Sequence, residues 1–164
     1  MPTGEELLDL IGELELDLVL IRRLLDSNRK SLERRRASEQ SEYDHAALGY
    51  SVHNLYGAIE GYALRIAKAF ENHLDERAWH RSVVRRMAVE VPGIRPRVWP
   101  LELTEHVDEL RRFRHAFRHI YDSGLDPRKL MIAQDHVEPA VEGVIKAHAA
   151  FVHELRELAK LEQE

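Results

Sequence analysis

The sequence predicts an all-α protein: an up-and-down bundle of five or six helices. Apolar residues recur at steps of three and four through most of the 164 residues, whereas the alternation typical of strands is nearly absent. One stretch, residues 91–100, holds three prolines and a glycine, and it cannot be helical. The length suits one sizeable core, so we expect a single domain over residues 1–164.

Two long helices are expected in the first half of the chain. An apolar seam predicts the first from about Thr3 to the run Arg34-Arg35-Arg36. Asn28 lies on this seam and could set a pairing register, although a tolerated polar residue near the helix end is the simpler interpretation. The second follows a capping box in Ser41-Glu42-Tyr43-Asp44 and should run to about Glu71.

Shorter helices are expected in the second half of the chain. A third helix fits Asp75 to about Val89. A fourth should begin at Thr104 and end near Ser123-Gly124, where glycine suits a C-cap. Asp126-Pro127 is a natural N-cap and first-turn pair for a short fifth helix. Pro139 then starts or kinks the last helix.

Composition excludes several classes of protein. The chain has no cysteine, which rules out disulfides and thiolate metal sites. The N-terminus lacks the order of a signal peptide, and the apolar run from Leu14 to Leu25 is too short and too charged to span a bilayer. We therefore expect a cytoplasmic protein that does not act in a membrane.

The charge distribution favours a polyanionic ligand. The net charge is -5, yet the segment from Arg77 to Arg118 holds ten arginines against five acidic residues. A basic middle in an acidic protein could focus a polyanion onto one cleft. Solvated helix faces with scattered arginines remain the alternative for the part of this segment before Arg111.

The most informative segment runs from Arg111 to Tyr121 and reads RRFRHAFRHIY. Four arginines and two histidines occupy its first nine positions. Arginine offers a permanent bidentate phosphate clamp, and histidine exchanges a proton near neutral pH. At about 100° per residue, however, a straight helix would point Arg114 and His119 about 140° apart. Either the helix kinks there or a two-fold copy supplies the complementary groups.

These residue types suit the cleavage of RNA without a metal. One histidine could deprotonate the 2'-hydroxyl and another could protonate the leaving 5'-oxygen, while arginines stabilise the dianionic transition state. The reaction needs no cofactor, and DNA, which lacks that hydroxyl, should be spared.

The spacing R-x4-H-x-Y, from Arg114 through His119 to Tyr121, resembles the HEPN superfamily and within it the HepT-like toxin ribonucleases. The segment from Leu48 to Phe70 also resembles the corresponding HepT-like helix. The resemblance implies a HEPN-like bundle and a metal-independent endoribonuclease toxin that cleaves RNA in a homodimer cleft. In that family the arginine and the histidine of the motif are catalytic, and these positions match Arg114 and His119.

The resemblance also implies roles for the neighbouring residues. His115 matches the polar position after the arginine. His115 and Arg118 also duplicate the catalytic residue types, which departs from the simplest family pattern, and with Arg111 we expect them to support catalysis and bind RNA. HepT-like toxins are usually paired with an MNT-type nucleotidyltransferase antitoxin, which attaches AMP to the motif tyrosine. Tyr121 would then be the acceptor, although a tyrosine near a helix end often only packs its ring.

Three other interpretations stay open. His115, His119 and Asp122 could form a metal site, but the flanking arginines would repel a divalent cation; the remaining histidines look too scattered to form a cluster. The protein could instead be a non-catalytic helical binding or scaffold partner of a nucleotidyltransferase. It could also be a plain helical dimerisation protein whose arginines neutralise the acidic first helix.

Overall fold

The computed structural model describes residues 2–71, 83–120 and 124–161. These residues form the helices α1 (Gly4–Ala37), α2 (Glu42–Phe70), α4 (Leu101–Phe117), α5 (Pro127–Asp135) and α6 (Val137–Leu161). Residues 83–87 are also helical, and the rest of the helix expected from Asp75 to Val89 lies largely outside the described residues. Within the described part the only β pairing is an isolated bridge between Val91 and Arg95. The all-α bundle predicted from the sequence is confirmed.

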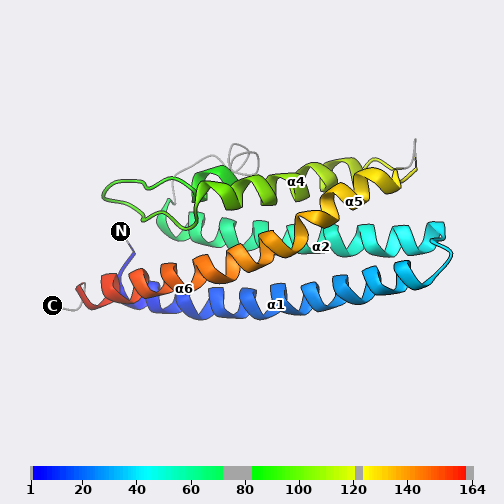
Figure 1. The fold of residues 1–164 in the computed structure, drawn as a ribbon. Helices are drawn as coiled ribbons and strands as arrows, with labels where there is room; N and C mark the ends of the chain where they lie inside the picture. The colour runs from blue at the N-terminus through cyan, green and yellow to red at the C-terminus, as the bar shows by residue number, and fades with distance from the viewer. Residues whose placement is uncertain (1, 72–82, 121–123, 162–164) are drawn as a thin grey trace.

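The two longest helices, α1 and α2, lie side by side and antiparallel, with α6 against α1 and α4 against α2 (Figure 1). Each of the two begins with a complete capping box. The Thr3 and Ser41 side chains accept hydrogen bonds from the backbone N–H groups of Glu6 and Asp44, whose carboxylates bond back to the cap residues. Both predicted starts are therefore confirmed, and the ends at Ala37 and Phe70 fall within a residue of those expected.

Asn28 is not a tolerated polar residue near a helix end, which corrects the simpler interpretation of the sequence. It is fully buried, and its amide donates to Ser51 Oγ (2.8 Å) and to Gln134 Oε1 (2.9 Å). Gln134 donates back to Asn28 Oδ1 at 2.8 Å. Because this triad joins α1, α2 and α5, shifting one helix along another would break its bonds.

The segment between residues 88 and 100 is irregular, as its prolines predict. The Arg95 side chain is fully buried and anchors it by pairing with Glu71 at 3.3 Å and donating to the Arg86 and Pro96 carbonyls at 2.9 Å. The Glu71 carboxylate and the two carbonyl oxygens offset part of the cost of burying this charge. Trp99 is also buried, and its indole N–H donates to the Thr104 hydroxyl at 3.1 Å.

Helix α4 begins and ends earlier than the sequence predicts. It starts at Leu101, directly after Pro100, and the Thr104 hydroxyl accepts from Trp99 instead of capping the helix. It ends at Phe117, and residues 118–120 form a tighter turn in which the His119 N–H donates to the Ala116 carbonyl at 3.0 Å. The expected end at Ser123-Gly124 is wrong for the regular helix. Gly124 does adopt the left-handed φ of +70° that favours glycine.

Helices α5 and α6 follow as predicted. The Asp126 side chain accepts from the Arg128 N–H at 2.9 Å, with Pro127 in the first turn. Only His136 separates the two helices, and Pro139 lies in the first turn of α6, where its missing N–H costs nothing. Among the described helices, none combines the length and the apolar character that crossing a bilayer requires.

Candidate functional site

Three polar side chains on one face of α2 meet the motif helix α4. His53, Tyr56 and Glu60 are spaced at i, i+3 and i+7, so that successive helical turns present them on the same side. Opposite them, α4 places Arg114 and Phe117 one turn apart. The junction between the two helices thus combines an imidazole, a phenol, a carboxylate and a guanidinium.

Arg114 is held in place from two directions. One Nη forms a short ion pair with Glu60 Oε2, and the guanidinium lies over the Tyr56 ring, 5.2 Å from its centre. The Tyr56 hydroxyl donates to the other Glu60 oxygen at 3.2 Å. Burial, and then the neighbouring Glu60 carboxylate, raise the pKa of Tyr56, so the phenol stays protonated. One quarter of the Arg114 side chain remains exposed, and it has a fixed orientation.

His53 lies beside this arginine and was not assigned a role from the sequence. Its ring packs 5.7 Å from the ring of Phe117. Burial, and then the charges of Arg114 and Arg118, lower the pKa of His53, which favours the neutral imidazole. His53 Nδ1 and Arg114 Nε are both buried and without a hydrogen-bond partner in the described part of the chain.

The other motif residues lie at the exposed end of α4. His115, Arg118 and His119 are exposed, and the rings of His115 and His119 meet edge to face with centroids 5.2 Å apart. The regular helix ends between Arg114 and His119, but within the described residues no hydrogen bond or ring contact joins these two side chains. Arg114 faces α2, whereas His119 lies against His115. Tyr121 and Asp122 lie outside the described residues.

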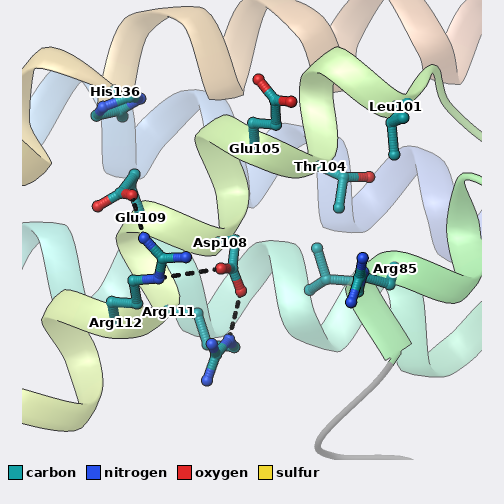
Figure 2. A pocket seen from close by; sticks show the side chains of 10 residues that line it. Arg85, Leu101, Thr104, Glu105, Asp108, Glu109, Arg111, Arg112 and His136 are labelled. Atoms are coloured by element: carbon teal, nitrogen blue, oxygen red, sulfur yellow. Dashed lines mark hydrogen bonds and ion pairs between the residues drawn. The ribbon is translucent and has the colours of Figure 1, made fainter.

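Arg111 and Arg112 are paired with acidic residues of their own helix. Asp108 contacts Arg111 Nε at 2.6 Å and Arg112 Nε at 3.2 Å, and Glu109 contacts Arg112 at 2.6 Å. Figure 2 shows these pairs on the wall of a cavity of about 750 Å³ that Arg85 and His136 also line. The charge of Arg111 also acts on Tyr56 and lowers the pKa of that phenol, against the larger effect of burial.

Two of the remaining histidines lie in contact, a pairing that the sequence did not predict. Nδ1 of His106 on α4 and Nδ1 of His136 at the α5–α6 junction are 2.9 Å apart, a hydrogen bond in which one imidazole donates and the other accepts. Because the two histidines are 30 residues apart in the chain, no local sequence pattern predicts their contact. In the described ranges, no group of three or more His, Asp or Glu side chains could hold a metal ion. The third ligand of the alternative metal site, Asp122, lies outside those ranges.

A comparison with protein-family models matches residues 47–155 to the family described as HepT-like protein. The matched segment covers two thirds of the chain, and the chain therefore belongs to the HepT-like family, as the motif spacing predicted. Neither the comparison with curated proteins nor the one with solved structures gave a match.

The matched segment contains the whole junction of α2 and α4 together with the segment from Arg111 to Tyr121. The resemblance of this part of α2 to HepT-like proteins is visible in the sequence, but the sequence does not connect His53, Tyr56 and Glu60 with Arg114. Their i, i+3, i+7 spacing was the available signal. The sequence does not give the rotation of α2 about its own axis relative to α4. This rotation decides which face of α2 meets the arginine.

Proposed function

We propose that this HepT-like protein is a cytoplasmic, metal-independent endoribonuclease that acts as the toxin of a toxin–antitoxin pair. The observation that carries the proposal is the oriented Arg114 guanidinium, which Glu60 and Tyr56 fix on the same helix whose end exposes Arg118 and His119. A preorganised cation and exposed imidazoles are the groups that metal-free cleavage of a phosphodiester requires. Membership of the HepT-like family supports the same activity.

In the proposed reaction the substrate supplies its own nucleophile. A histidine takes the proton of the 2'-hydroxyl, whose oxygen then bonds to the adjacent phosphorus. The bond from phosphorus to the 5'-oxygen breaks, and a second histidine protonates that oxygen. The products are a 2',3'-cyclic phosphate and a free 5'-hydroxyl. We assign proton transfer to His119, with His115 in support, and assign the charge on the phosphate to Arg114, Arg118 and Arg111.

The proposed site requires two copies of the chain. Within one chain Arg114 faces α2 while His119 lies at the exposed end of the helix. A two-fold pairing of these helix ends would bring the arginine of each protomer toward the histidine of the other. We therefore propose a homodimer with the RNA bound in the groove between the protomers.

Regulation would act through Tyr121. We propose that an MNT-type nucleotidyltransferase attaches AMP to its hydroxyl, which puts bulk and a negative phosphate among the arginines where substrate would bind. Mass spectrometry after incubation with that enzyme and ATP checks this assignment. AMP found on another residue, with Tyr121 unmodified, would contradict it.

The decisive experiment is RNA cleavage in the presence of a chelator. We expect His119→Ala to lose about 10²- to 10⁴-fold in rate, the range of general acid–base catalysis. Arg114→Lys keeps a positive charge for Glu60 but loses the planar fork, and it should lose about 10²-fold or more. His153→Ala, an exposed histidine on α6, is the matched control and should keep the wild-type rate.

Three outcomes would overturn the proposal. Wild-type rates in both motif variants would remove their catalytic role, and loss of cleavage on chelation would show that a metal is required. RNA binding without any cleavage by the wild-type protein would instead support the non-catalytic binding partner.

A further inference from the structure

The neutral imidazole of His53 has no part in the reaction as proposed so far, although it lies inside the arginine cluster. Two cationic side chains, Arg114 of α4 and Arg118 in the turn after it, act on it electrostatically. On its own helix, Tyr56 and Glu60 follow at the next two turns, and both contact Arg114. A phosphate held between Arg114 and Arg118 would therefore lie next to His53.

The surroundings of the ring indicate which nitrogen carries the proton. Nδ1 is buried and has no acceptor, so a proton on Nδ1 would be an orphaned donor inside the protein. A lone pair on Nδ1, by contrast, is stabilised by the nearby guanidinium groups. The neutral ring should therefore keep its proton on Nε2, which is also the nitrogen that is left to meet a ligand.

We propose that His53 is a further catalytic residue of this site, whose Nε2–H donates a hydrogen bond to a non-bridging oxygen of the scissile phosphate. The inference rests on the proposed ribonuclease function and deepens it. Negative charge accumulates on these oxygens as the 2'-oxygen attacks, so a fixed donor binds the transition state more tightly than the ground state.

This role differs from that of a general base. A base must present an unprotonated Nε2 to the 2'-hydroxyl, whereas the buried environment of Nδ1 favours a protonated Nε2. Proton transfer therefore stays with His119, and His53 acts as a neutral electrophile. The two roles predict different behaviour when the imidazole is replaced by an amide, because an amide N–H can donate but cannot act as a base near pH 7.

Two substitutions and one control test the inference by RNA cleavage. His53→Phe keeps an aromatic ring against Phe117 but has no donor, and kcat should fall about 10²- to 10³-fold, as for removal of one transition-state donor. His53→Gln restores an N–H near the position of Nε2, and its rate should recover to within about tenfold of wild type. The exposed His153→Phe should cleave RNA at the wild-type rate.

The pattern of rates separates the alternatives. Full activity in His53→Phe would show that the ring only packs. Loss in both variants, with the acidic limb of the pH–rate profile moved, would make His53 a base and overturn the donor role. A wild-type protein that cleaves no RNA would end the proposed function and this inference together, whereas an unaffected His53→Phe would end only the inference.

Nitrogen-15 NMR of the wild-type protein at pH 7 gives an independent test that does not depend on how the variants fold. The His53 ring should be neutral with its proton on Nε2, and this resonance should shift when a non-cleavable 2'-deoxy oligonucleotide binds. An imidazolium, or a proton on Nδ1, would overturn the inference.

Discussion

Tyr62 and His148 illustrate how a single buried pair makes stability depend on pH. The Tyr62 hydroxyl and His148 Nδ1 lie 3.2 Å apart between α2 and α6, where both side chains are buried. Burial lowers the pKa of His148 below its ordinary value, with Glu15 acting in the opposite direction. The folded protein therefore binds a proton at this site less readily than the unfolded chain does.

This lowered pKa predicts acid destabilisation. Above the unfolded pKa of about 6.5 both states hold a neutral histidine, and the free energy of unfolding is unaffected. As the pH falls below that value the unfolded chain takes up the proton first, so the free energy of unfolding decreases. Urea unfolding at pH 8 and at pH 6 measures the loss, to which His53 contributes with the same sign. We expect a smaller loss in His148→Gln; an unchanged loss would show that other groups dominate.

Helices α4 and α6 approach each other closely at Gly143. A Cβ atom added there would lie 2.6 Å from Leu103 Cδ1, far inside contact distance. The missing side chain therefore lets α6 pack against the start of the helix that carries Arg114. The position of the motif helix depends on this contact as well as on its contacts with α2.

Alanine substitution at Gly143, with Gly12 as the control position, tests how closely α4 and α6 pack. Gly143→Ala should be about 1–3 kcal/mol less stable than the helix-propensity gain alone would make it, because Leu103 must move in a packed core. Gly12→Ala, on an exposed face of α1 with nothing within 4 Å, should raise the free energy of unfolding by about 0.5–1 kcal/mol through helix propensity. Urea unfolding measures both. Equal stability of the two variants would mean that α4 and α6 are not tightly packed here.

The whole protein must be a dimer if the proposed site is to be complete. Each chain separates Arg114 from His119, yet the proposed reaction needs both types at one phosphate. Light scattering should therefore give a mass twice that of the 19.1 kDa chain. A monomer that still cleaves RNA would contradict the two-fold site.

Complementation gives a sharper test of the shared site. If the protein is the proposed dimer, co-expressed Arg114→Lys and His119→Ala chains should form mixed dimers in which one arginine and one histidine, from different protomers, remain intact. If the site combines them across the interface, the mixed dimers should recover cleavage that neither variant has alone. Recovery should be absent if each site is built within one chain.

The sequence alone determined three helix starts and the family motif, because both depend on residues that are close together along the chain. The capping residues Thr3, Ser41 and Asp126 set the starts of three helices, because a cap bonds to backbone groups only two or three residues away. The motif from Arg114 to Tyr121 indicated the family in the same way, through residues that are close along the chain.

The tertiary structure decided what those residues contact. Arg114 pairs with Glu60, 54 residues away, and Asn28 bonds to Gln134, 106 residues away. Periodicity predicts which face of a helix is apolar, but not which helix covers that face or how far each is rotated about its axis. The packing of α2 against α4 therefore decides both the environment of His53 and the orientation of Arg114.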